Sequence, residues 1–497
     1  MDPLPHSADF WSLGHDDHPH DECGIFGVHS PGEQVANTIF FGLFALQHRG
    51  QESAGISVSD GREIRSHRRM GLVSQVFDHE TIAWLRGHLG IGHTRYSTTG
   101  SSVIGNAQPL EVETPYGRIC VAHNGNIVNT RELRAELQHE GIRFTTTNDS
   151  EVIAQCIASL HRGDLVNAVR ETMERVRGAY SVLILTEDKM IAIRDPHGVR
   201  PLCLGELDGG GAVVSSETCA LHVVGARFLR EIDPGELIVI DRESVIDYQA
   251  VQLVRNATCV FEFIYLARPD SHIYGKNLHL ARRKMGQQLF QEHPVEAANL
   301  VIPVPDTGIP AAIGFSEASH IPFGEGLIKN RYIGRTFIEP DQRMRELGVR
   351  MKLSALRENL YGRKVVMVDD SIVRGTTTGQ IVRLLRDAGA AEVHVRISSP
   401  PVQWPCFYGV DMADRHELIA ARMSTDEIRE HIGANSLGYL SMDGVHRAIG
   451  MGKGQFCTAC FTGKYPISVP RDLKNAKFAL EELDEGIALA SVAAHQG

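Results

Sequence analysis

Three continuous runs rich in apolar residues in the second half of the chain restrict its fold more than any other feature. They are ANLVIPVP (298–305), KVVMVDD (364–370) and AEVHVRISSP (391–400). Such runs are typical of strands buried on both faces of a sheet. The amphipathic stretch 376–389 predicts a helix between the second and third runs. Strand, helix and strand in that order predict a parallel α/β sheet.

The junction between the second run and the helix has the composition of a phosphate-binding loop. Two acids end the strand, and a glycine and three threonines open the helix: Asp369, Asp370, Gly375, Thr376, Thr377 and Thr378. The unpaired N–H groups of a first helical turn attract anions, and glycine lets a ligand approach the backbone closely. Carboxylates at this end of a strand can bind sugar hydroxyls or Mg²⁺. The alternative is a plain strand-to-helix turn capped by aspartate and threonine.

Two further segments of the second half suit the same kind of ligand. VIPVPDTGIPAA (301–312) repeats the strand-to-loop pattern, and its Asp306, Thr307 and Gly308 could face a pyrophosphate or its metal. The basic segment 326–338 carries Lys329, Arg331 and Arg335. A mobile basic segment suits closure over a pyrophosphate, although a solvated loop is an equally simple interpretation.

The first half of the chain has a different construction. From residue 23 to about 254, short strands alternate with a few helices. We expect strands at 179–186 and 236–241, and helices at 130–141 and 149–163, the latter capped by Asp149 or Ser150. A chain of 497 residues is too long for one core, so a domain boundary is expected within 250–280.

Composition excludes several classes of protein. The net charge of -11 and the absence of a basic segment argue against nucleic-acid binding. No apolar run approaches the roughly 20 residues of a membrane span, and the first 22 residues lack the pattern of a secretory signal. A cytoplasmic protein is therefore expected. Its nine scattered cysteines are expected to be core thiols, metal ligands or nucleophiles.

The acidic, histidine-spotted tail that precedes Cys23 raises the question of whether this cysteine is a nucleophile. At a chain terminus its own α-amino group, with a pKa of about 7.7–8.0, could serve as general base. Inside a chain it has no such amine, so residues 1–22 would have to be a propeptide cut after Glu22. The binding of an amide substrate would suit Arg95, Asn124 with Gly125, and Asp149. Each also has a simpler interpretation: Asn124-Gly125 is a favoured hairpin turn, and Arg95 and Asp149 could be surface charges.

Several long motifs resemble those of known families, and this resemblance favours the catalytic interpretation of these residues. CGIFGV, LQHRGQESAGI (46–56), GHTRYSTTG (92–100) and AHNGNI resemble the N-terminal-nucleophile glutamine amidotransferases. VDDSIVRGTTT resembles the signature of the type I phosphoribosyltransferases. The combination, together with FEFIYLARPDS (261–271), is similar to the glutamine phosphoribosylpyrophosphate (PRPP) amidotransferase family from Cys23 to about residue 470.

The resemblance implies a fold and a division of the chain. It implies an N-terminal-nucleophile αββα sandwich, an α+β fold, over 23–255, followed by a parallel-sheet α/β phosphoribosyltransferase domain over 256–470. Residues 1–22 are then the propeptide, and 471–497 form a helical tail without an assigned role.

The resemblance also implies roles for individual residues. Cys23 is the nucleophile, Asn124 and Gly125 form the oxyanion hole, and the glutamine pocket contains Arg49, Arg95, Thr98 and Asp149. The PRPP site contains Lys329, Arg331, Arg335, Ser371, Gly375, Thr376, Thr377 and Thr378. One Mg²⁺ per subunit is expected near Thr307, Asp369 and Asp370.

Four cysteines are candidates for a metal cluster. FCTACF (456–461) is a C-x-x-C that alone fits a redox pair or half a metal site. Cys120 and Cys156 are expected to be core thiols. One branch of the family carries a [4Fe–4S] cluster, which implies one cluster per subunit on Cys259, Cys406, Cys457 and Cys460; zinc is the alternative for four thiolates.

The implied activity is the formation of 5-phosphoribosylamine from PRPP and glutamine, the committed step of purine synthesis, with ammonia passing between two sites. It implies feedback inhibition by purine nucleotides and a homotetramer, with no nucleic-acid or membrane partner. Two alternatives are a non-catalytic, purine-sensing regulator with a phosphoribosyltransferase fold, and a hydrolase whose second domain only binds nucleotides.

Overall fold

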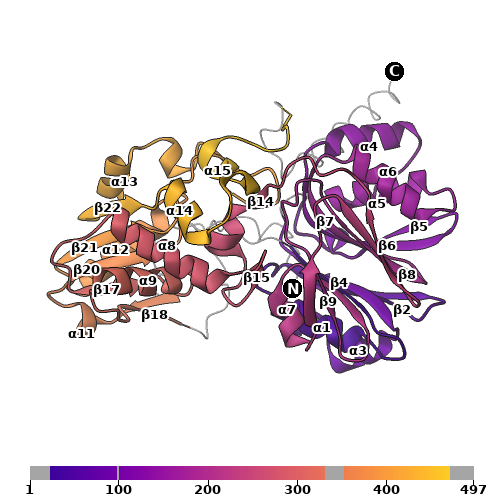
Figure 1. The fold of residues 1–497 in the computed structure, drawn as a ribbon, viewed down its shortest axis with the longest axis horizontal. Helices are drawn as coiled ribbons and strands as arrows, with labels where there is room; N and C mark the ends of the chain where they lie inside the picture. The colour runs from indigo at the N-terminus through magenta and orange to yellow at the C-terminus, as the bar shows by residue number, and fades with distance from the viewer. Residues whose placement is uncertain (1–22, 98–99, 331–351, 413, 471–497) are drawn as a thin grey trace, which may run out of the picture.

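The computed structural model describes residues 23–97, 100–330, 352–412 and 414–470, which form two lobes. Figure 1 shows the earlier part of the chain, coloured indigo to magenta, in one lobe and the later part, coloured red to yellow, in the other. The predicted propeptide 1–22, Thr98, Arg331, Arg335 and the tail 471–497 lie outside the described residues.

The first lobe contains two antiparallel sheets. In spatial order, the seven-stranded sheet consists of β11 (Arg227–Glu231), β9 (Cys203–Glu206), β10 (Ala212–Ser215), β1 (Gly24–His29), β4 (Leu89–Arg95), β2 (Ser53–Ser59) and β3 (Ile64–Met70). The six-stranded sheet consists of β13 (Val245–Gln249), β12 (Glu236–Asp241), β8 (Lys189–Arg194), β7 (Gly178–Leu185), β6 (Gly117–Ile127) and β5 (Leu110–Thr114).

Three apolar layers hold this lobe together. One layer lies between the two sheets, where Ile25 and Ile91 meet Leu183 and Ile238. Helices α1 (Ala36–Ala45) and α7 (Thr218–Val223) pack on the outer face of the seven-stranded sheet. Helices α4 (Thr130–His139), α5 (Asp149–Leu160) and α6 (Leu165–Arg175) pack on the outer face of the other sheet. The predicted αββα sandwich is confirmed.

The second lobe is built on a four-stranded parallel sheet, as the three apolar runs predicted. Its spatial order is β17 (Leu300–Pro303), β20 (Lys364–Asp369), β21 (Glu392–Ile397) and β22 (Ser436–Tyr439). Alternate residues of β20 enter different cores. Val366 and Val368 face α8 (Leu278–Glu292) and α9 (Ile309–Ser319), whereas Val365 and Met367 face α12 (Thr376–Asp387) and α13 (Thr425–Ile432).

Shorter elements complete both lobes. In the first lobe they are α2 (Val73–Val76), α3 (His79–Trp84) and the 3-10 turn Ile104–Asn106. In the second they are β14 (Thr258–Cys259), the π-helix Glu262–Leu266, β15 (His272–Ile273), β16 (Lys276–Asn277), β18 (Leu327–Lys329), β19 (Leu353–Ala355), α11 (Arg357–Leu360), the 3-10 turns Ile419–Ala421 and Lys453–Gln455, α14 (Met442–Ile449), β23 (Phe456–Cys457) and α15 (Ala459–Thr462).

The elements expected from the sequence are present, with one correction. Helix α5 begins where it was predicted, but neither Asp149 nor Ser150 is its cap. The cap is Asn148, whose side chain accepts a hydrogen bond from the Ser150 N–H at 3.0 Å. The carboxylate of Asp149 is therefore free to point into the lobe. Within the described residues, no helix is both long enough and apolar enough to cross a membrane.

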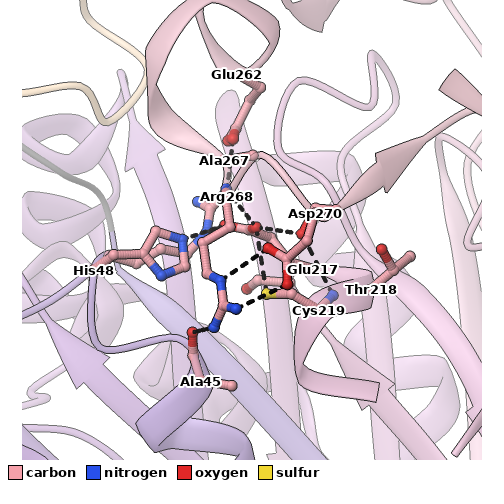
Figure 2. A network of polar contacts seen from close by, with 12 residues as sticks. Ala45, His48, Glu217, Thr218, Cys219, Glu262, Ala267, Arg268 and Asp270 are labelled. Atoms are coloured by element: carbon pink, nitrogen blue, oxygen red, sulfur yellow. Dashed lines mark hydrogen bonds and ion pairs between the residues drawn. The ribbon is translucent and has the colours of Figure 1, made fainter. Parts of the chain in front are cut away.

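A buried polar network joins the two lobes around Glu217, and Figure 2 shows it at close range. Glu217, from the first lobe, accepts hydrogen bonds from the Arg268 N–H at 2.9 Å and the Ser271 hydroxyl at 2.7 Å, both from the second. The side chains of His48 and Arg49 lie 2.7 and 2.5 Å from its other oxygen. Burial opposes ionisation of Glu217, but these neighbours outweigh it and hold its pKa well below the usual range.

Glu262 extends this network from the start of the second lobe. Its carboxylate is fully buried and accepts a hydrogen bond from Arg49 Nη2 at 2.6 Å, while Arg200 Nη1 lies 3.7 Å from its other oxygen. The π-helix that begins at Glu262 is held by Arg282, whose guanidinium donates to the carbonyl groups of Glu262, Phe263 and Ala267. One carboxylate of the second lobe thus compensates two buried arginines of the first.

We predict that Glu262→Gln will destabilise the protein strongly. The substitution keeps the shape of the side chain but leaves Arg49 and Arg200 without its charge, and breaking a buried ion pair costs about 3–5 kcal/mol. Urea unfolding followed by tryptophan fluorescence measures the change. Glu317→Gln is the matched control, because it breaks the exposed pair with Arg283 and should leave the midpoint nearly unchanged. Equal midpoints for both variants would contradict the role given to Glu262.

Candidate active sites

Cys23 directly precedes β1 and is buried against the end of β4. Its thiol donates a weak hydrogen bond to the carbonyl oxygen of Tyr96 at 3.4 Å. Burial raises the pKa of Cys23 to about 11, although the Tyr96 hydrogen bond and the charge of Arg95 oppose this rise. In this chain, where residue 22 precedes it, the thiol is therefore protonated near neutral pH.

Arg95 lies at the end of β4 beside Cys23 and is buried, so its interpretation as a surface charge is wrong. Its guanidinium donates to the carbonyl oxygens of Ser101 at 3.2 Å and Gly100 at 3.4 Å. Glu52 lies 3.7 Å from the same group and accepts hydrogen bonds from both the N–H and the hydroxyl of Ser97 at 3.0 Å. Sequence reasoning missed Glu52, which binds Ser97 and lies beside Arg95.

Asn124 and Gly125 lie inside strand β6, where they pair with Ser181 and Tyr180 of β7. The alternative of a hairpin turn at Asn124-Gly125 is therefore wrong. Asn124 is fully buried, and neither its amide nitrogen nor its amide oxygen has a hydrogen-bond partner among the described residues. Because buried polar groups are nearly always satisfied, an amide of this kind marks a place where a ligand binds.

Asp149 is buried at the start of α5. One of its oxygens accepts a hydrogen bond from the Ile127 N–H at 3.2 Å, and the other lies 3.7 Å from His123 Nδ1. Asp149 and Arg95 both act electrostatically on the Cys23 thiol, which places these two charges around one nucleophile. The interpretation of Asp149 as a surface charge is wrong, since its residue exposure is 3%.

A second residue that sequence reasoning missed is His93, which ties the two sheets together next to this site. It pairs with Ile25 across β1 and β4, and its Nε2 lies 3.0 Å from the carbonyl oxygen of His123 on β6. Burial, together with the charge of Arg95, lowers the pKa of His93 to about 3. The imidazole is thus a neutral donor at physiological pH. A histidine within an apolar strand was the available signal.

Arg49 is linked to the Cys23 region through its neighbour in the chain. The residue after it, Gly50, packs against the backbone of Thr94 and Arg95. The Arg49 guanidinium itself is held between Glu217 and Glu262, as described above. A direct contact of Arg49 with glutamine stays a prediction. Thr98, the other expected pocket residue, lies outside the described part of the chain.

A second site lies at the carboxyl end of the parallel sheet. Asp369 ends β20, and the oxygens of Asp370 accept hydrogen bonds from the hydroxyls of Thr307 and Ser371, both at 2.6 Å. The structure thereby joins the two strand-to-loop segments that the sequence singled out separately. Three oxygen-bearing side chains at one point are the donor set that Mg²⁺ prefers.

The helix that follows this loop presents its first turn without a side-chain cap. Its N-cap is Gly375, which has φ +81° and no side chain, so the alternative of a turn capped by aspartate or threonine is wrong. Thr376 is exposed, Thr377 is half-buried and Thr378 is buried, in the first turn of α12. Lys329, at the end of β18, pairs with Asp306 at 2.6 Å on the rim of this site.

Four cysteines line one small cavity in the second lobe. The parallel pairing of β14 with β23 places Cys259 opposite Cys457, and the backbone N–H groups of Gln403 and Trp404 bind the carbonyl oxygen of Cys460. The cavity is bordered by Cys259, Cys406, Cys457 and Cys460. In contrast, Cys120 and Cys156 are fully buried in the first lobe, as expected of core thiols.

The arrangement of these thiols bears on what they can hold. Burial raises the pKa of Cys259 and that of Cys457 to about 12 in the protein without a cation. Within the described residues, no group of three or more potential ligands is close enough to hold a single metal ion. Four thiolates can hold either zinc or an iron–sulfur cluster.

Comparisons with known proteins identify relatives that span both lobes. A family model for a glutamine amidotransferase domain matches residues 93–223. The amidophosphoribosyltransferase of Synechococcus elongatus is 52% identical over 470 residues, covering 94% of this chain and 95% of its own. That of Methanocaldococcus jannaschii is 49% identical and covers 90% and 98%.

Two solved structures share the whole architecture. One, described as the allosteric regulatory enzyme of purine biosynthesis, has a TM-score of 0.87 at 46% identity and covers 92% of this chain and 99% of its own. The other is glutamine PRPP amidotransferase from B. subtilis complexed with ADP and GMP, with a TM-score of 0.86 at 46% identity and coverage of 90% and 98%.

Proposed function

The chain belongs to the amidophosphoribosyltransferases, which catalyse the first step of purine biosynthesis, and we propose that it releases ammonia at Cys23 and consumes it at Asp369 and Asp370. The observation that carries this proposal is the buried, unpartnered amide of Asn124. Family membership contradicts the alternatives of a non-catalytic regulator and of a hydrolase that only binds nucleotides.

In the first half-reaction the Cys23 sulfur attacks the side-chain amide of glutamine. The oxyanion that forms accepts hydrogen bonds from Asn124 Nδ2 and the Gly125 N–H, which are fixed before the reaction begins. Arg95 binds the substrate carboxylate and Asp149 its α-ammonium group, so the two buried charges orient the amide toward sulfur. Ammonia leaves, and water then releases glutamate from the thioester.

In the second half-reaction ammonia displaces pyrophosphate from C1 of PRPP. The uncapped first turn of α12, with Ser371 and Thr376 to Thr378, binds the 5-phosphate, and the two acids bind the ribose hydroxyls. Thr307, Asp369 and Asp370 would hold one Mg²⁺, which neutralises charge on the departing pyrophosphate. Lys329, Arg331 and Arg335 close over the same group. Ammonia must stay neutral to react, so its route between the lobes has to exclude water.

We further propose one [4Fe–4S] cluster per subunit, held by Cys259, Cys406, Cys457 and Cys460. Support comes from the four thiols, which line a single cavity. The cavity is lined by these cysteines and by Val199 and Arg200 of the first lobe, and neither Asp369 nor Asp370 borders it, so the cluster would have a structural role.

We also propose that residues 1–22 are a propeptide. The supporting observation is that Cys23 within a continuous chain is a buried, protonated thiol without a base of its own. Feedback inhibition by purine nucleotides, a homotetramer, a cytoplasmic location and the domain limits 23–255 and 256–470 belong to the same proposal. The B. subtilis relative bound to ADP and GMP supports the first of these.

Separate assays with glutamine and with ammonia test the two half-reactions. We expect Cys23→Ser to lower glutamine-dependent formation of phosphoribosylamine at least about a thousandfold, because the nucleophile is lost. Asn124→Ala should lower its kcat by about 10²–10³, the usual cost of one oxyanion donor. Both variants should retain ammonia-dependent activity, whereas Asp370→Asn should lose both. Loss of the ammonia-dependent reaction in Cys23→Ser would contradict the division of labour.

The state of the chain terminus should set the pH dependence of Cys23. With residue 22 attached, the thiol has a pKa of about 11, so its alkylation by iodoacetamide should rise about tenfold per pH unit from pH 7 toward pH 11. A chain that begins at Cys23 carries an amine with a pKa near 8, which accepts the thiol proton, so its alkylation near pH 7.5 should be at least about tenfold faster. Peptide mass spectrometry reads both rates. An active enzyme whose first residue is Met1 would contradict the proposal that residues 1–22 are a propeptide.

Iron and sulfide analysis of purified variants tests the cluster. We expect about four iron ions per chain in the native protein, and none in Cys259→Ser, which removes a ligand opposite Cys457. Cys120→Ser, a buried thiol of the first lobe, is the matched control and should keep its iron. Stoichiometric zinc in the native protein, or iron that survives in Cys259→Ser, would overturn the assignment.

A further inference from the structure

A loop of the second lobe lies directly against the strand that carries Asn124 and Gly125. The loop spans residues 406–410, between β21 and α13 in the chain. Its Phe407 carbonyl oxygen accepts a hydrogen bond from Asn126 Nδ2 at 2.9 Å. Gly409 packs so closely that a Cβ atom built there would lie 3.0 Å from the carbonyl carbon of Gly125 and 3.1 Å from its Cα.

The loop is held rigidly in this position. Arg200, a fully buried residue of the first lobe, donates two hydrogen bonds to the Tyr408 carbonyl oxygen, at 2.9 and 2.5 Å. From the other side, the Tyr408 hydroxyl donates to the carbonyl oxygen of Ile467 at 2.6 Å and accepts from the N–H of the same residue at 3.1 Å. Both the backbone and the side chain of Tyr408 are thus fixed, one by each lobe.

The Gly125 peptide is consequently confined on two sides. Toward β7, a Cβ atom at Gly125 would lie 2.0 Å from the carbonyl oxygen of Ala179, and φ at Gly125 is +143°. Toward the second lobe, Gly409 occupies the remaining space with φ +109°. A peptide N–H that serves an oxyanion must be aimed accurately, since a displacement of about 1 Å can cost a hundredfold in rate.

We propose that Gly409 is a positioning residue of the glutaminase site. Gly409 acts through Gly125. Because Gly409 has no side chain, the loop of the second lobe can pack directly against strand β6 and fix the direction of the Gly125 N–H. The ammonia-producing site of the first lobe is therefore completed by backbone from the lobe that consumes the ammonia. The inference rests on the proposed oxyanion role of Asn124 and Gly125.

The substitution Gly409→Ala tests this arrangement, with Gly209→Ala as its matched control. Gly209 has a similar φ of +99°, but a Cβ atom there would meet nothing within 4 Å. The two variants thus share backbone strain and differ in contact with Gly125. We expect Gly409→Ala to lower glutamine-dependent kcat by about tenfold to a hundredfold, with KM for glutamine changed less than about threefold. Ammonia-dependent activity should be unchanged, and Gly209→Ala should behave as the native enzyme in both assays.

Asn124→Ala, measured in parallel, distinguishes a failure of the role of Gly409 from a failure of the oxyanion role of Asn124 and Gly125. Loss of glutamine-dependent activity in Asn124→Ala but not in Gly409→Ala would overturn the role of Gly409 alone. Full activity of Asn124→Ala would overturn the oxyanion assignment and the inference with it. An equal loss of the glutamine and ammonia reactions in Gly409→Ala would also overturn the inference, because it would indicate general damage to the fold.

A second variant covers the case in which Gly409→Ala does not fold. Asn126→Ala removes the hydrogen bond to the Phe407 carbonyl oxygen without adding any atom. It should lower glutamine-dependent kcat about threefold to tenfold and leave the ammonia-dependent reaction unchanged. Native glutamine-dependent kcat in a folded Asn126→Ala protein would count against a role for the loop.

Discussion

The buried ion pairs of Arg49 with Glu217 and Glu262 are the interaction on which the arrangement of the two lobes depends. A charge so deeply buried is tolerated only with a partner of opposite charge. Arg49 and Glu217 belong to the first lobe and Glu262 to the second, so the lobes cannot separate without breaking the buried pair of Arg49 with Glu262. Such pairs favour one relative placement over others more than they add to stability.

That placement matters because the glutaminase site is not a property of the first lobe alone. Cys23 and Arg95 come from one sheet, and Asn124 comes from the facing sheet. The loop at Gly409 then reaches this second sheet from the other lobe. Arg200 connects the two features, because its guanidinium binds the Tyr408 carbonyl oxygen and also lies near Glu262. Arg200 therefore contributes both to the contact between the lobes and to the position of the loop beside the proposed oxyanion site.

The proposed PRPP site could be inferred from the sequence because its residues are almost entirely local. Apolar strand, paired acids, glycine and helix follow each other within 364–385, and each step has a physical reason that needs no distant partner. Local reasoning was less exact at α5. Both Asn148 and Asp149 are good caps, and only the hydrogen bond of Asn148 to Ser150, which leaves Asp149 to face Cys23, decides between them.

The contacts that hold the candidate site residues in place could not be predicted from the sequence, because the residues that make them are far apart in the chain. Glu217 meets Arg49 across 168 positions, and Asn126 meets Phe407 across 281. No spacing or periodicity encodes such contacts; they follow from how sheets and lobes pack. A polar residue within an apolar strand, such as His93 in β4, indicates that a hydrogen-bond partner exists but does not identify that partner. For this reason the sequence could suggest candidate side chains for the glutamine site, whereas the groups that hold them in place required the structure.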